Sequence, residues 1–297
     1  MYLIKLTCVL FILVITNTSY AIDNIKMHKP ILGEDKRSLY KDEVIQRALA
    51  ISESNFGPFT LEFINIDMTT MRALHSLKVD KMINVFIAAA STEWDRVATP
   101  IRIPIRFGQL SYRLLLINKS NLEKFALVNS FDDFKNLIAG LQQGWTINNI
   151  LHKSNIETVI GNNFEGLFLM LNKNRFDYFP RAIYEAYNEL DDRINTLENI
   201  VVEPTLALYI PMVSYIYVST DELTIIKRLE YGLQTMLENG ELKNLFNKYY
   251  KEDVERANLK DRKIIIINNP YFDEQGLVEN KLLPIPVTIQ DAGFSGN

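Results

Sequence analysis

The sequence has little of what thiol, metal or nucleotide chemistry requires. Its 297 residues include one cysteine, Cys8, and three scattered histidines. The histidines lack the spacing of a zinc or iron site, and no phosphate-loop, nucleophile-elbow or zinc-helix motif occurs. The net charge of −4 gives no reason to expect nucleic acid or an anionic membrane surface as a partner. We therefore expect a chain with no cofactor, no metal and no catalytic constellation.

The N-terminus has the pattern of an export signal. Lys5 precedes the apolar run LTCVLFILVI, which is too short to span a bilayer, and Thr16–Ser19 and Ala21 are polar or small. Cleavage after Ala21 would remove residues 1–21 and, with them, Cys8. The alternative is an uncleaved N-terminal anchor. We expect an exported chain without disulfides, which in a Gram-negative cell means a periplasmic protein.

Two extended stretches divide the rest of the chain. Residues 101–119 begin with prolines and end in the apolar run Tyr112–Ile117, which suits a strand buried on both faces. A similar pattern returns at Tyr209–Ser219, and α/β-like sequence lies on both sides of each stretch. We expect the chain to leave one lobe, build a second and return, so that two crossover strands join two lobes. Clefts between lobes are common sites for small ligands.

The helix and strand signals predict parallel sheets flanked by helices. Between Pro30 and Ala88 the order reads as β-α-β-α-β, with the first strand at Pro30–Gly33 and the first helix at Lys41–Ser54. The helix that begins near Ser130 is expected to carry an apolar face as far as Leu141. Further helix starts are predicted from capping residues or a first-turn proline, at Thr69 or Thr70, Ser91 or Thr92, Ser130, Pro180 and Ser219.

Several motifs resemble one family. Ser91–Arg96, the strand Tyr112–Lys119 and the helix end Glu238–Leu242 are similar to parts of the bacterial periplasmic solute-binding proteins of extracellular family three, the receptors of polar amino-acid uptake. The turn Gln143–Thr146 and the run Arg175–Arg181 resemble an uncharacterised branch of these proteins. The resemblance covers nearly all of the chain after the export signal.

The resemblance implies an α/β, two-lobed type II periplasmic-binding-protein fold that closes over a small polar ligand. It implies an inner-membrane permease as partner, and it makes Arg96 the residue that grips a ligand carboxylate. We expect a signal peptide at 1–21, one lobe at 22–110 and 219–270, the other at 111–218, and a C-terminal tail at 271–297. A monomer is expected.

The residues themselves suggest further ligand contacts. Arg181 follows a strand and is expected in the first turn of a helix, where an anion would be favoured; the alternative is a surface pair with Glu185. Trp145, in a glycine-flanked turn, could stack on a ligand or plug the core of its lobe. Gln143 and Tyr40 complete the set argued from the residues.

Thr146 joins the candidates because it belongs to the same turn as Trp145. Arg113 lies within a buried strand and is expected to pair with an acid of either lobe at the hinge, because an unpaired buried charge is costly. Three functions stay open: a receptor that captures a small polar or anionic solute for an ABC-type permease, a ligand sensor that docks on a membrane signalling protein, and an enzyme on the same scaffold.

Overall fold

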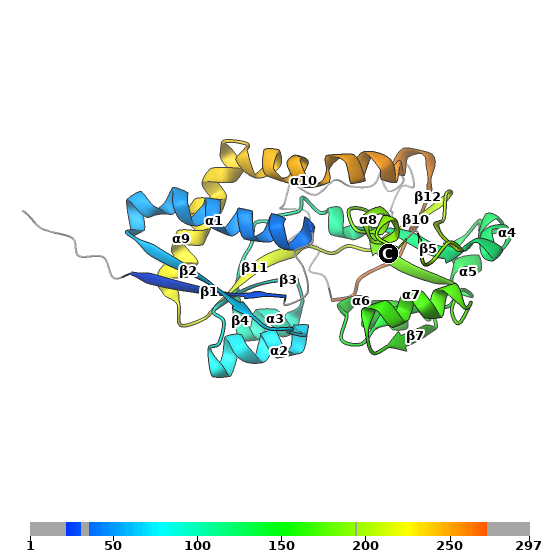
Figure 1. Ribbon diagram of the computed structural model, residues 1–297, viewed down its shortest axis with the longest axis horizontal. Coiled ribbons are helices and arrows are strands. Elements are labelled where there is room, and N and C mark those ends of the chain that lie inside the picture. Colours follow the sequence, from blue (N-terminus) through cyan, green and yellow to red (C-terminus); the bar gives the residue numbers. More distant parts are fainter. Residues whose placement is uncertain (1–21, 31–35, 194, 272–297) are drawn as a thin grey trace, which may run out of the picture.

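The structure, a computed structural model, describes residues 22–30, 36–193 and 195–271. These residues form two lobes, each built around its own β-sheet (Figure 1). The expected two-lobed α/β fold is therefore confirmed. The predicted signal peptide at 1–21, most of the strand predicted at Pro30–Gly33 and the tail beyond Tyr271 lie outside the described residues.

The first lobe has a five-stranded sheet in the order β2-β1-β3-β11-β4. Strand β1 is parallel to both of its neighbours, whereas β11 is antiparallel to β3 and to β4. The sequence did not predict β1, whose polar and charged residues hide the strand pattern. The strands are β1 (Asp23–Lys29), β2 (Phe59–Asn65), β3 (Val85–Ala89), β4 (Ala98–Ile101) and β11 (Ser214–Ser219).

Helices flank this sheet and extend toward the second lobe. Thr69 and Ser91 accept hydrogen bonds from the first turns of α2 and α3, so both predicted caps are confirmed. Helix α1 crosses α9 so closely that a Cβ at Gly232 would overlap the carbonyl oxygen of Ala48. The helices are α1 (Lys36–Phe56), α2 (Thr70–His75), α3 (Thr92–Val97), α9 (Leu223–Glu238) and α10 (Glu241–Ala257).

The second lobe has a seven-stranded sheet in the order β12-β10-β5-β8-β6-β7, and β9 also pairs with β5. Every residue of β5 is buried, as the apolar run predicted. The strands are β5 (Tyr112–Asn118), β6 (Ala139–Gln142), β7 (Thr158–Gly161), β8 (Tyr178–Ala182), β9 (Ile200–Val202), β10 (Leu206–Tyr209) and β12 (Lys263–Ile266). The helices are α4 (Leu122–Ala126), α5 (Phe131–Phe134), α6 (Thr146–Lys153), α7 (Phe164–Asn172) and α8 (Ala186–Asp191).

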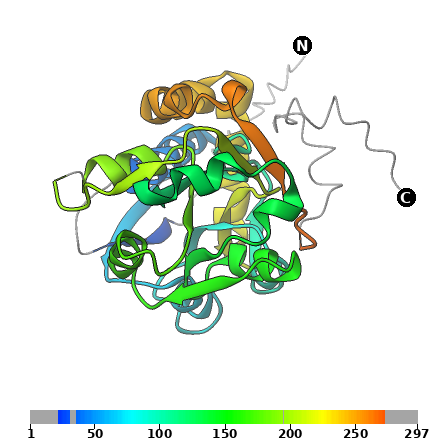
Figure 2. The same cartoon turned by 90° about the vertical axis from the view of Figure 1, so that its right-hand side faces the viewer.

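The boundaries between the lobes differ from those expected. Strand β11 pairs with β3 and β4, so residues 214–218 belong to the first lobe and not to the second. Strand β12 pairs with β10, so residues 263–266 belong to the second lobe. The chain thus crosses a third time, between α10 and β12. Helix α10 lies across the top of the molecule, and the chain descends from it into β12 (Figure 2).

Three local predictions were wrong. The helix predicted from Ser130 ends at Phe134 despite a complete capping box, and β6 follows, because Gly140 leaves room for the Phe176 ring that packs against it. Pro180 does not open a helix but lies within β8, opposite Leu115 of β5. Ser219 does not cap α9, because its hydroxyl donates instead to the carbonyl of Leu77.

Candidate ligand-binding cleft

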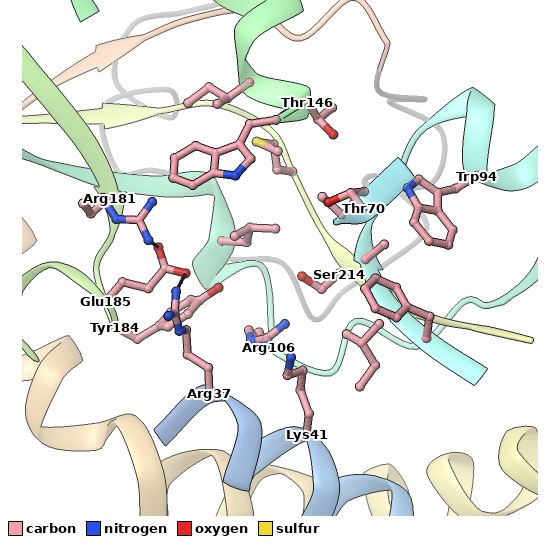
Figure 3. A pocket seen from close by; sticks show the side chains of 18 of the residues that line it. Arg37, Lys41, Thr70, Trp94, Arg106, Thr146, Arg181, Tyr184, Glu185 and Ser214 are labelled. Atoms are coloured by element: carbon pink, nitrogen blue, oxygen red, sulfur yellow. Dashed lines mark ion pairs between the residues drawn. The ribbon is translucent and has the colours of Figure 1, made fainter. Parts of the chain in front are cut away.

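A cavity of about 390 Å³ lies between the two lobes. The first lobe lines it with side chains from α1, β3 and α3, and the second lobe with side chains from the start of α6 and the end of β8 (Figure 3). The crossing segments form the remaining wall through Arg106, Arg113 and Met212. Its volume falls within the range usual for small-ligand pockets, roughly 300–1,000 Å³.

An ion-pair network joins the lobes at one side of this cleft. The guanidinium of Arg181 donates two hydrogen bonds to Glu189, both at 2.6 Å, and lies 3.0 Å from Glu185. Arg37, from the first turn of α1, lies 3.2 Å from Glu189 and 3.6 Å from Glu185. Burial raises the pKa of Glu185, but Arg181 and Arg37 outweigh this effect and hold its pKa below the usual value. The network thus pairs two guanidinium groups with two carboxyl groups.

Two further arginines face the cleft without such partners. Arg106 and Arg113 are each 6% exposed, and the Nε of each has no hydrogen-bond partner. Within the described residues neither forms an ion pair, so the acid predicted to pair with Arg113 is not found there. Burial lowers the pKa of Arg113, yet a guanidinium keeps its proton in proteins. Two positive charges are thus held at the base of the cleft.

The surroundings of these two arginines are aromatic and apolar. The guanidinium of Arg106 lies 5.7 Å from the ring of Tyr40 and 5.5 Å from that of Tyr184. Arg113 approaches the sulfur of Met212 at 3.5 Å. Ring faces and a thioether stabilise a cation only partly, because they carry no full negative charge. An anion that enters the cleft would complete the electrostatic balance.

Each lobe also contributes a tryptophan to the walls. Trp94 of α3 is buried and stacks on Phe86 at 5.4 Å, with the two rings nearly parallel. Trp145, at the start of α6, is partly exposed and stacks on Phe179 at 5.9 Å. The guanidinium of Arg181 lies 4.9 Å from the Trp145 ring. The two indoles, one from each lobe, both line the cavity and offer it apolar surface.

The structure brings together half of the site residues predicted from the sequence. Arg181, Trp145 and Thr146 line the cavity. Arg181 does so from a strand, and it forms the ion pair with Glu185 that was the alternative, although this pair is buried and not at the surface. Tyr40 lies in the core beneath, where its hydroxyl donates to the carbonyl of Ile105.

The remaining two predictions, Arg96 and Gln143, are exposed and do not belong to the lining. In α3 it is Trp94 that turns inward, two positions before Arg96. Sequence reasoning missed Arg106, and it treated Arg113 as structural, although both lie in the proline-rich stretch at 101–119. A signal was present, since the stretch has three arginines, Arg102, Arg106 and Arg113, among mostly apolar residues.

Residues 22–30, 36–193 and 195–271 contain no group of three or more His, Cys, Asp or Glu side chains able to hold a metal ion. In the same residues no helix combines the length and apolar character that crossing a bilayer would require.

The sequence matches no protein-family model and no curated protein. Solved structures do match in fold. An ancestral arginine-binding protein bound to glutamine aligns with a TM-score of 0.57 at 15% identity, over 78% of this chain and 99% of that one. A probable amino-acid ABC transporter extracellular-binding protein, ytmK from Bacillus subtilis, gives 0.57 at 14% identity, over 78% and 100%. A histidine kinase sensor domain with similarity to periplasmic binding proteins gives 0.55 at 13% identity, over 77% and 96%.

At these identities the likeness establishes the fold. The chain has the two-lobed type II solute-binding architecture that its sequence motifs implied. The proteins named above are binding proteins and a sensor domain rather than enzymes.

Proposed function

We propose that this chain is an exported receptor that captures a small polar or anionic solute between its lobes and presents it to an ABC-type permease. The observation that carries the proposal is the pair of buried arginines, Arg106 and Arg113, which face a cavity of about 390 Å³ without a carboxylate partner among the described residues. Burying uncompensated charge is costly, so such groups persist where a ligand supplies the missing charge.

The positions of the arginines suit capture by closure. Both lie near the crossing segments, whereas the tryptophans belong to separate lobes, so a ligand held by the arginines would contact both lobes at once. A ligand with more contacts in the closed form shifts the population toward that form. Arg181, Trp145 and Thr146 would complete the contacts on the second lobe.

The sequence and the structural relatives support the proposed location and partner. The predicted export signal at 1–21 supports a periplasmic location, and the relatives named above include an arginine-binding protein and a probable amino-acid ABC transporter extracellular-binding protein. We propose that the protein acts as a monomer. One relative is a histidine kinase sensor domain, which supports the second candidate, a sensor that docks on a membrane signalling protein. A pull-down from membranes, with and without bound ligand, separates these two candidates by the protein that is recovered.

Thermal denaturation with a metabolite panel tests the receptor function itself. A solute that binds only the folded form stabilises it by mass action, by about 2.7 kcal/mol when the free solute is at a hundredfold excess over its dissociation constant. The temperature of the unfolding midpoint rises as a result. No shift with any amino acid, organic acid or peptide would refute the proposal. Recovery of the bound solute unchanged in a mass-spectrometric time course would separate a receptor from an enzyme.

A further inference from the structure

The acidic groups of the cleft are already occupied. Among the described lining residues Glu185 is the acidic side chain, and its Oε2 accepts a hydrogen bond from the backbone N–H of Ala182 at 3.1 Å and lies 3.0 Å from Arg181. Its other oxygen faces Arg37 at 3.6 Å. The carboxylate of Glu189 is likewise taken, by two hydrogen bonds from Arg181. A ligand ammonium group would find no uncommitted carboxylate among these residues.

The cationic groups, in contrast, exceed the acids. The network of Arg37, Arg181, Glu185 and Glu189 is balanced, which leaves the charges of Arg106 and Arg113 uncompensated by any ion pair within the described residues. Each guanidinium has five N–H donors in a fork that matches a carboxylate. Each of the two side chains could bind one carboxylate of a ligand, or both could contact a single doubly charged group.

We infer that the ligand is a small organic dicarboxylate that carries no ammonium group. This inference rests on the proposed function and narrows its solute from polar or anionic to one chemical class. Two carboxylates neutralise Arg106 and Arg113, and an uncharged body suits the space between Trp94 and Trp145. An α-amino acid would bring a cation into a cleft whose described lining residues already hold more positive than negative side chains.

Matched pairs of probes that differ by one ammonium group test the inference on the native protein. Succinate and aspartate, glutarate and glutamate, and adipate and 2-aminoadipate are titrated by calorimetry. In at least one pair the dicarboxylate should bind roughly tenfold or more tightly than its amino counterpart, because an unpaired buried ammonium carries the full desolvation penalty. Phenyl phosphate is titrated as well, because its two negative charges lie on one phosphate group and not on two carboxylates.

The outcomes separate this inference from the proposed function. If in every pair that binds the amino acid binds as tightly as its dicarboxylate partner, the inference is overturned and the receptor function is left standing. Binding of phenyl phosphate alone also overturns it, in favour of a phosphate ligand. Silence of every probe, together with silence of the wider metabolite panel, overturns both.

Variants assign the effect to the two arginines. Arg106→Gln and Arg113→Gln should each weaken dicarboxylate binding by tenfold or more, whereas Arg96→Gln, on the exposed side of α3, should leave it unchanged. Circular dichroism confirms that each variant is folded. Equal affinities in all three variants would overturn the assignment, and the probe pairs on the native protein decide the ligand class even where a variant does not fold.

Discussion

Two buried arginines should respond in opposite ways when the charge is removed. Arg113 is buried in the cleft without an ion pair among the described residues. The free-energy cost of desolvating its guanidinium on folding is therefore offset only in small part. Arg228 is also buried, but it lies 2.7 Å from Asp23 and donates to Ser52 and to the carbonyl of Gly57. Replacing a buried ion pair by apolar residues of similar volume is often neutral or stabilising by about 1–4 kcal/mol, and a buried arginine without a partner lacks even the attraction of such a pair, whereas breaking a buried pair costs about 3–5 kcal/mol.

We therefore expect Arg113→Met to raise the stability of the ligand-free protein by about 1–4 kcal/mol and Arg228→Met to lower it by about 3–5 kcal/mol. Each kcal/mol corresponds to roughly 2–4 °C in the unfolding midpoint of a chain of about this size. Differential scanning calorimetry of dialysed protein measures both changes. The nearby Glu185 carboxylate offsets part of the desolvation cost of Arg113. The stabilisation of the Arg113→Met variant should therefore lie toward the lower end of this range. Destabilisation of similar size in both variants would show that Arg113 is compensated and would refute the charge-surplus argument.

Three further predictions test the core, the ion-pair network and the walls of the cleft. Gly232→Ala should destabilise the first lobe by about 1–3 kcal/mol, because its methyl group would overlap the Ala48 carbonyl; urea denaturation checks this, and an unchanged midpoint would contradict the close helix crossing. The lowered pKa of Glu185 means that its stabilising effect is complete above its usual value of 4.5 and is lost as the pH falls toward about 2. Glu185→Gln should therefore flatten this acid limb of the stability curve, and a limb as steep as in the native protein would assign it to other carboxyls. Both tryptophans of the chain, Trp94 and Trp145, line the cleft, so ligand binding should change the intrinsic fluorescence, and the single Trp→Phe variants should each retain part of the change.

The sequence predicted the elements whose signals are local. The buried run of β5, the caps at Thr69 and Ser91 and the stop of α9 before Gly240 are all patterns that a few neighbouring residues carry. Where tertiary packing overrides local preference, the predictions were wrong. Pro180 has a strong helix-start signal, yet its place opposite Leu115 in the sheet decides its conformation.

The candidate site shows the same division. Arg181 and Trp145 were found because each stands out in its own turn or run, but the partners of Arg181 could not be read from spacing alone. Glu189 reaches it across eight positions, and Arg37 comes from the other lobe. In α3 the sequence offered Arg96, whereas the direction of the helix turns Trp94 inward.

The sequence by itself determined that this chain alternates helices and strands, passes between two lobes and resembles an exported receptor, because hydrophobic periodicity and short motifs are written in neighbouring residues. Only the tertiary structure decided which arginines form ion pairs and which do not. Whether Arg37 meets a carboxylate depends on segments more than a hundred positions apart, and the tertiary structure also places Arg106 and Arg113 at the cleft without an ion pair among the described residues.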